Sequence, residues 1–236
     1  FYFPDNGLLQ YEGGLKKMDD GGFVFQGQGT LYNQTGQSVY QGLWEDGTRS
    51  GNGTAWLEDG SIYSGNWVDD YPDGKGTYLF RDGTEYEGGF IRGKKHGQGT
   101  FKEADGFVSY DGEWKDGQRF GKGRVNKRDS SSYDGDWLDG KPHGNGMFTY
   151  PDGRVYTGTM KQGLRQGLGE LRRSDGSIAY EGEWDRNLRH GKGKAYSASG
   201  LIKFDGDFYE GYQSGTGSEY RDDGTLYYQG SWKQNL

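Results

Sequence analysis

The stretch Tyr133-Asp134-Gly135-Asp136-Trp137 is followed by Gly140-Lys141-Pro142-His143-Gly144-Asn145-Gly146 and then by Asp152-Gly153. Its first part, Tyr-x-Gly-x-Trp, recurs along the chain, and from Tyr40 onward successive copies begin 23 or 24 residues apart. A Gly-x-Gly segment begins 11 residues after the first position of each of these copies, except the final one. Self-similarity at a fixed period is the sequence signature of a repeat architecture.

The repeat occupies nearly the whole chain. Full copies of the first part are Tyr40-Gly42-Trp44, Tyr63-Gly65-Trp67, Tyr110-Gly112-Trp114, Tyr133-Gly135-Trp137, Tyr180-Gly182-Trp184 and Tyr228-Gly230-Trp232. Looser copies begin at Tyr11, Tyr86, Tyr156 and Phe204, and a spacing of 29 residues after Tyr11 indicates an insertion near residues 16–22. We therefore expect nine repeats and one final strand, forming one continuous array over residues 1–236. Because the chain begins at Phe1 without Met, we expect it to be a fragment of a longer protein.

Alternation within each copy predicts strands. Positions i, i+2 and i+4 of a strand share one face, so Tyr133, Gly135 and Trp137 point the same way while Asp134 and Asp136 point the other way. Asp-Gly pairs mark turns between strands, and no segment shows a sustained helical period. The predicted fold is all-β, an elongated single-layer antiparallel β-hairpin solenoid of about nine and a half repeats, which twists into a rod with an aromatic and glycine groove.

The glycines predict how the rings pack. Glycine weakens a strand and marks close approach by another group, so we expect the tyrosine and tryptophan rings to lie flat over bare backbone. A single layer would leave this aromatic face partly covered. Two strands per repeat at ~4.8 Å each give a rise of roughly 10 Å, and hence a rod on the order of 90 Å long.

Composition excludes several classes. The 236 residues include 47 Gly and no Cys, with 30 % hydrophobic and 16 % aromatic residues. Without cysteine there are no disulfides, no thiol catalysis and no cysteine-based zinc site. No apolar run approaches the roughly 18 residues of a membrane-spanning helix, and no signal peptide opens the chain.

The repeat imitates catalytic motifs without completing them. The stretches 88–95 and 135–141 resemble a phosphate-binding loop but lack its Ser or Thr and open no helix. His96, His143 and His190 lie two repeats apart, roughly 20 Å by the same rise, and so cannot share a metal ion; an interface metal held by one His in an oligomer stays open. We expect no enzyme activity, no catalytic residue, no cofactor and no metal.

Charge is uneven along the chain. The whole chain carries a net charge of −7, whereas residues 92–194 carry 20 basic and 15 acidic residues, a net charge of +5. Lys122, Arg124, Lys127 and Arg128 belong to this segment. They could contact anionic lipid head groups, or they could pair across strands with the acidic residues of the same charged face. The overall acidity disfavours nucleic acid.

The complete unit resembles the MORN (membrane occupation and recognition nexus) repeat, and the resemblance spans Tyr11 to Trp232. It departs from the pattern at the ends, where Leu15 replaces the first Trp and Phe204 and Phe208 replace Tyr and Trp. MORN proteins are scaffolds of membrane-apposed cytoskeleton and of cilia. Chains made almost only of such repeats resemble the cytoskeletal scaffolds of protozoan parasites, which form antiparallel dimers through their C-terminal repeats.

The resemblance implies a cytoplasmic, non-enzymatic scaffold at the membrane-apposed cortex, or alternatively in cilia. It implies a homodimer and cytoskeletal or membrane-associated protein partners, with peripheral phospholipid binding as the alternative function. The expected partner groove comprises Tyr40, Trp44, Tyr63, Trp67, Tyr86, Phe90, Tyr110, Trp114, Tyr133, Trp137, Tyr156, Tyr180 and Trp184. The expected dimer contacts are Phe204, Phe208, Tyr228 and Trp232.

Overall fold

The computed structural model describes residues 1–2, 4–5 and 7–233 and divides the chain into two compact units, residues 1–118 (unit 1) and 119–236 (unit 2). Unit 1 holds β1 (Tyr11–Lys17), β2 (Phe23–Tyr32), β3 (Ser38–Glu45), β4 (Thr48–Trp56), β5 (Ile62–Val68), β6 (Tyr71–Leu79), β7 (Glu85–Ile91), β8 (Lys94–Lys102) and β9 (Val108–Lys115).

Unit 2 begins within β10 (Gln118–Asn126) and continues with β11 (Ser132–Leu138), β12 (Lys141–Thr149), β13 (Val155–Lys161), β14 (Leu164–Arg172), β15 (Ile178–Asp185), β16 (Leu188–Tyr196), β17 (Ile202–Tyr209), β18 (Tyr212–Tyr220) and β19 (Leu226–Trp232). All regular elements of the described residues are strands, as the sequence predicts. Their number, nineteen, equals nine hairpins and one further strand.

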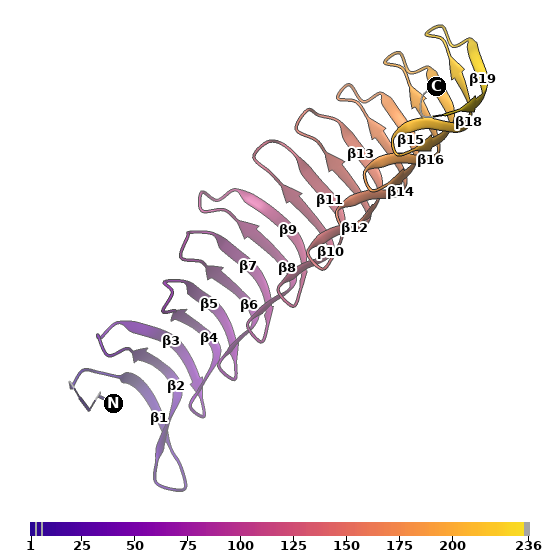
Figure 1. Ribbon diagram of the computed structural model, residues 1–236. Helices are drawn as coiled ribbons and strands as arrows, with labels where there is room; N and C mark the ends of the chain where they lie inside the picture. The colour runs from indigo at the N-terminus through magenta and orange to yellow at the C-terminus, as the bar shows by residue number, and fades with distance from the viewer. Residues whose placement is uncertain (3, 6, 234–236) are drawn as a thin grey trace. The chain divides into compact units, whose positions relative to one another are not determined.

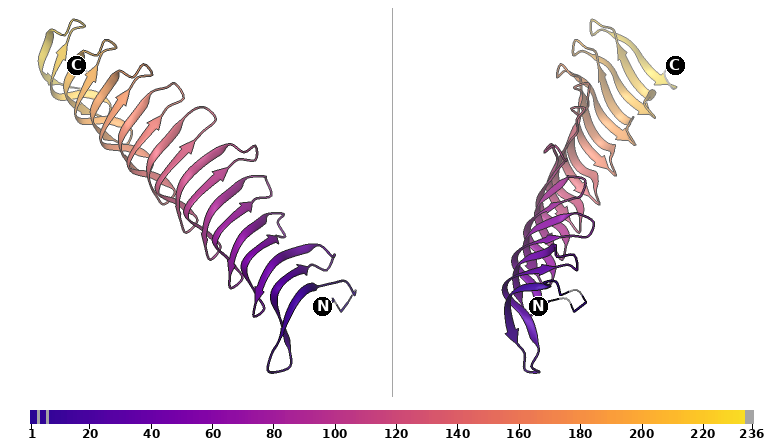
Figure 2. Two further views of the ribbon diagram at one scale, coloured as in Figure 1. Left: turned by 180° about the vertical axis from the view of Figure 1, so that it is seen from behind. Right: turned by 90° about the vertical axis from the view of Figure 1, so that its left-hand side faces the viewer.

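Within each unit every strand pairs antiparallel with the next strand of the chain, as Figures 1 and 2 show. The register places glycine opposite glycine. Gly65 of β5, for example, pairs with Gly53 of β4 on one side and with Gly76 of β6 on the other. The β-hairpin solenoid predicted from the repeat is therefore confirmed in each unit.

Tight turns close the hairpins on one side. At Asp116-Gly117 and Asp139-Gly140 both residues have positive φ, between 50° and 87°. Such a pair of angles defines the turn whose twist matches a two-stranded hairpin, and it favours Asp or Asn followed by Gly. The longer turns use aspartate differently: the Asp82 carboxylate accepts hydrogen bonds from the backbone N–H and the hydroxyl of Thr84.

One face of the strands carries acid–base pairs. The Lys122 ammonium lies 2.5 Å from the Asp136 carboxylate, and Lys192 lies 2.6 Å from Asp207 on the neighbouring strand. These pairs confirm the predicted cross-strand pairing. Both lysines are largely exposed, so each pair stabilises by about 1 kcal/mol or less. The stability of the fold therefore depends on the opposite, aromatic face.

Candidate functional site

The repeat tyrosines pack directly on glycine backbone. A Cβ atom added at Gly99 would lie 2.3 Å from the Tyr86 hydroxyl oxygen, and one at Gly88 would lie 2.6 Å from the Cα of Gly99. The Tyr86 hydroxyl donates a hydrogen bond of 3.0 Å to the carbonyl of Gly89. The same bond, from each tyrosine to the residue three positions on, recurs at Tyr11, Tyr40, Tyr63, Tyr110, Tyr133, Tyr156, Tyr180 and Tyr228.

The tryptophans tie each repeat to the preceding one. Trp114 Nε1 donates a 2.9 Å hydrogen bond to the carbonyl of Gly99, which belongs to the preceding hairpin. Its ring stands edge-on to Tyr86 and to Tyr110, with centroid distances of 5.2 Å and 5.1 Å. Edge-to-face pairs contribute about 0.5–1.5 kcal/mol beyond the area they bury. Alternating rings therefore form a ladder within each unit, with Met160 in place of one ring in unit 2.

The ladder is a core rather than an open groove. Its tyrosines are 0–2 % exposed from Tyr40 to Tyr180, and the tryptophans from Trp44 to Trp184 that belong to it are at most 7 % exposed. The expectation that the aromatic face is only partly covered is wrong for all thirteen predicted groove residues. Most of these rings contact rings of a neighbouring repeat, and cationic side chains lie over several of them. Their role in partner binding stays a prediction.

Among the described residues, five cations lie over rings of this ladder from one shared position of the repeat. Each cation stands nine residues after the tyrosine that begins its own repeat. The ring that it faces stands four residues after the first residue of the following repeat. The cation-to-centroid distances are 4.3 Å for Arg49 over Trp67, 4.8 Å for Lys95 over Trp114, 5.3 Å for Arg119 over Trp137, 4.0 Å for Arg165 over Trp184 and 5.0 Å for Arg189 over Phe208.

We call these five residues the cationic cover. Each cation is attracted to the negative face of the ring below it. Pro72 and Pro142 occupy the same position where the following repeat carries Phe90 and Met160 in place of Trp. Sequence analysis missed the cover, although the constant offset of nine residues was the signal that could have found it.

Burial changes the acidity of the core tyrosines. Because the phenolate form is poorly solvated in this layer, burial raises the pKa of Tyr40, Tyr86 and Tyr156 to about 12. It also raises the pKa of Tyr63, Tyr133 and Tyr180. These hydroxyl groups therefore stay protonated and donate their hydrogen bonds at neutral pH.

The predicted dimer contacts fall into two classes. Phe204 and Phe208 are buried, at 0 % and 3 % exposed, because they occupy the ladder like the residues they replace. They are therefore core residues of the free chain. Tyr228 on β19 is 43 % exposed, and Trp232 is partly exposed. Further exposed aromatic side chains of this region are Tyr209, Tyr212 and Tyr227.

The four predicted lipid contacts lie on β10 and the turn that follows it. All four side chains are exposed. Lys122 pairs with Asp136, and Arg124 Nε donates to the Asn126 side chain over 3.0 Å. Cross-strand pairing, one of the two interpretations of this basic segment, is thus confirmed at Lys122. Lipid contact stays a prediction.

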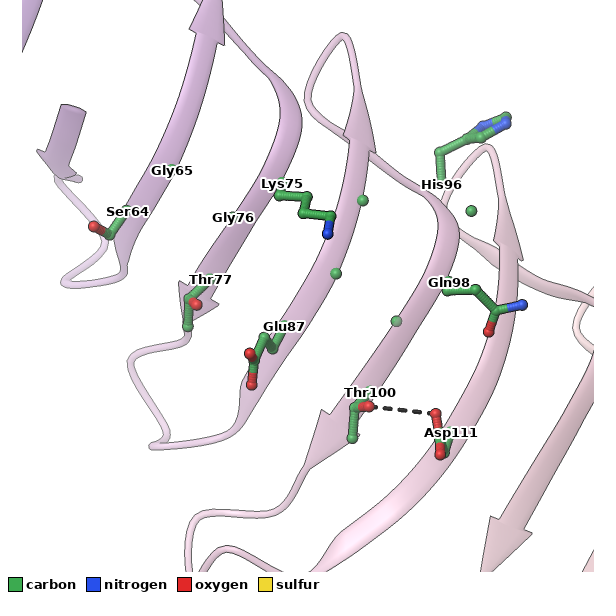
Figure 3. A pocket seen from close by; sticks show the side chains of 14 residues that line it. Ser64, Gly65, Lys75, Gly76, Thr77, Glu87, His96, Gln98, Thr100 and Asp111 are labelled. Atoms are coloured by element: carbon green, nitrogen blue, oxygen red, sulfur yellow. Dashed lines mark hydrogen bonds between the residues drawn. The ribbon is translucent and has the colours of Figure 1, made fainter. Parts of the chain in front are cut away.

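The polar face of unit 1 carries a shallow hollow of about 720 Å³. Figure 3 shows its lining, in which Thr100 donates a 3.3 Å hydrogen bond to Asp111 while His96 points away from both. Glycine backbone forms much of its floor. Within the described residues, no three His, Asp or Glu side chains are grouped so that they could hold a metal ion.

Comparison with known families agrees with the repeat found in the sequence. A family model for the MORN repeat matches residues 40–62, 63–85, 86–107, 110–125, 133–153, 156–178, 180–202 and 204–226. The match leaves out the first hairpin with its insertion and the final strand β19. Comparison with curated proteins found no match. The described part of the chain contains no helix long and apolar enough to cross a membrane.

Proposed function

Because the chain belongs to the MORN repeat family, whose repeats serve as interaction modules for membranes and proteins, we propose that it is a non-enzymatic scaffold of the membrane-associated cytoskeleton. In this proposal it works in the cytoplasm at the membrane-apposed cortex, or in cilia, and self-associates through its C-terminal repeats. Partner proteins contact the side chains that cover the aromatic ladder, because the rings themselves are buried.

The exposed edge at β19 carries the proposal. Among the described residues β19 pairs with β18, and in this proposal a strand of a second copy pairs along its other side. Tyr228 is 43 % exposed there, whereas the equivalent Tyr180 is 1 % exposed. Leu226 and Tyr227 are exposed beside it. An unpaired edge bearing apolar side chains is a template for a second chain.

The test is the mass of the particle in solution. We expect multi-angle light scattering at micromolar concentration to give a dimer, because pairing at β19 would cover the exposed aromatic side chains. Replacement of Leu226 and Tyr227 by Glu places like charges in that interface and should give a monomer. The matched control is Tyr71→Glu, which charges a similarly exposed tyrosine in unit 1 and should leave the dimer intact.

A monomeric native chain would refute self-association. An unchanged dimer in the Leu226→Glu, Tyr227→Glu variant would refute its placement at β19. Crosslinking mass spectrometry of the protein in its cell would identify cytoskeletal partners, and the absence of any such partner would overturn the scaffold proposal.

Peripheral phospholipid binding is the second candidate, since Lys122, Arg124, Lys127 and Arg128 are all exposed on one hairpin. Near an anionic surface each such charge contributes about 1 kcal/mol. We expect the chain to co-sediment with phosphatidylserine vesicles and to be released by salt. Arg124→Glu with Lys127→Glu should abolish binding, whereas Lys94→Glu, an exposed charge of unit 1, should not. Binding that is insensitive to salt, or no binding, would exclude this function.

A further inference from the structure

A pocket of about 330 Å³ in unit 2 gathers three arginines. Arg154, Arg165 and Arg189 line it together with apolar side chains, among them Leu171 and Leu188. Arg154 is neutralised by the Asp152 carboxylate, 2.7 Å from its Nε. Among the described residues neither Arg165 nor Arg189 makes an ion pair. The pocket therefore holds two positive charges without a carboxylate.

Both arginines belong to the cationic cover and are partly buried. Arg165 lies 4.0 Å over Trp184 and donates from Nη2 to the carbonyl of Asn187, over 2.6 Å. Its Nε is buried and has no hydrogen-bond partner. Arg189 donates from Nη2 to the carbonyl of Gly211. Burial lowers the pKa of both guanidinium groups, and no carboxylate raises either one.

The equivalent arginine of unit 1 has a carboxylate partner that Arg165 lacks. Arg49 occupies the same place in its repeat, and its partner in the adjacent turn is Asp70. One Asp70 oxygen accepts from the Arg49 backbone N–H and from its Nε, both at 2.9 Å. At Arg165 the equivalent residue is Asn187, whose Oδ1 accepts only from the backbone N–H. The two turn residues share a left-handed backbone, with φ of 67° and 73°.

With Asn187 at the position that Asp70 occupies in unit 1, the positive charge of Arg165 has no carboxylate partner. An unpaired buried polar group costs about 1–3 kcal/mol, and more when it is charged. Asp70 removes that cost at Arg49, which shows that a carboxylate fits beside the arginine at this position of the repeat. At Arg165 the missing carboxylate can come from another molecule, because the pocket reaches both Arg165 and Arg189 and is open to solvent. Its apolar lining suits the methylene groups of a glutamate stem.

We propose that this pocket binds an acidic side chain, Glu or Asp, of a protein partner, with the guanidinium groups of Arg165 and Arg189, which both line the pocket, as the carboxylate donors. The inference rests on the proposed function as an interaction module, because it names the chemistry by which a partner segment is held. A charge-assisted hydrogen bond to a guanidinium is about twice as strong as a neutral one. The pocket would then select acidic segments among possible partners.

The test observes the Arg165 side chain directly. An N-acetylated oligoglutamate peptide amide is titrated into the ¹⁵N-labelled chain while the arginine Nε–H signals are followed by NMR, with Arg165→Gln used to assign the signal. We expect a saturable shift of the Arg165 signal. Oligoglutamine of the same length is the neutral control and should cause none.

Two substitutions that exchange a side-chain amide and a carboxylate make the test more specific. Asn187→Asp supplies an internal carboxylate as Asp70 does, and should weaken peptide binding on the order of tenfold or more while keeping the fold. The reverse exchange, Asp70→Asn, should make the Arg49 signal of unit 1 respond to the peptide. Neither residue belongs to the aromatic ladder, so near-ultraviolet circular dichroism should stay unchanged in both variants.

Several results would overturn the proposal. They are an Arg165 signal that the acidic peptide does not move, or peptide binding that Asn187→Asp leaves unaltered. A response to inorganic phosphate or to phosphatidylinositol phosphate vesicles, but not to the peptide, would assign the pocket to phosphate instead. The dimer mass and its dependence on Leu226 and Tyr227 are independent of these outcomes, so failure here is distinguishable from failure of the scaffold proposal.

Discussion

Replacing Gly99 by Ala will destabilise unit 1 by about 3 kcal/mol, near the upper end of the cost of overpacking a core. The added Cβ would lie 2.3 Å from the Tyr86 hydroxyl oxygen and 2.5 Å from its ring. Tyr86 is fully buried and hydrogen-bonded to the Gly89 carbonyl, so the ring cannot withdraw without losing that bond. Urea denaturation followed by tryptophan fluorescence measures the loss.

Gly106→Ala is the matched control. Gly106, unlike Gly99, has a left-handed backbone that favours glycine, with φ of 84°, and nothing lies within 4 Å of an added Cβ. Its replacement should cost only the left-handed strain of about 1–2 kcal/mol. If Gly99→Ala costs no more than Gly106→Ala, the close approach of ring and backbone is not what stabilises the repeat.

The second large effect is loss of stability in alkali. In the folded chain the pKa of Tyr40, Tyr86 and Tyr156 is raised to about 12, against about 10 for an unfolded tyrosine. A raised pKa means that the stabilisation is fully present below about pH 10 and is lost as the pH rises toward 12. In that window each such tyrosine lowers the free energy of unfolding by about 1.4 kcal/mol per pH unit.

Urea denaturation at a series of pH values, with tyrosinate absorbance read in parallel, measures this slope. Tyr86→Phe is the control variant. It should cost about 1 kcal/mol near pH 8, because one hydrogen bond is lost, and the slope above pH 10 should become shallower by the share of one tyrosine. Phe204 shows that a phenyl ring fits the same glycine floor. A free energy of unfolding that is constant from pH 8 to pH 11 would contradict this explanation.

Much of the fold could be predicted from the sequence because each repeat contacts mainly its neighbours. The period placed every hairpin, and alternation assigned Tyr133, Gly135 and Trp137 to one face. The glycines predicted ring-on-backbone packing, which Gly146 confirms: an added Cβ would lie 2.4 Å from the Tyr133 hydroxyl oxygen. Only short-range information was needed for these features.

Less of the candidate site could be predicted from the sequence. Alternation indicates which face a ring occupies, but not what covers it, and the cover comes from residues such as Arg165 that reach over the following repeat. The exposure of the ladder was therefore predicted wrongly. Phe204 and Phe208 differ from the repeat pattern, and the family resemblance predicts a dimer contact in this region. A phenyl ring fills the same core position, so their departure from the pattern reflects packing.

The bond from each tryptophan of the Tyr-x-Gly-x-Trp copies to a glycine carbonyl of the preceding hairpin has a mechanical consequence. Pulling on one end of a unit would load one indole N–H hydrogen bond and one edge-on ring pair at a time. The release of one repeat of 23 or 24 residues would lengthen the chain by roughly 80 Å when those residues are fully extended. Such a ladder would yield under tension repeat by repeat rather than all at once. In the scaffold role proposed for this chain, a tether with this property would lengthen and recover without rupture.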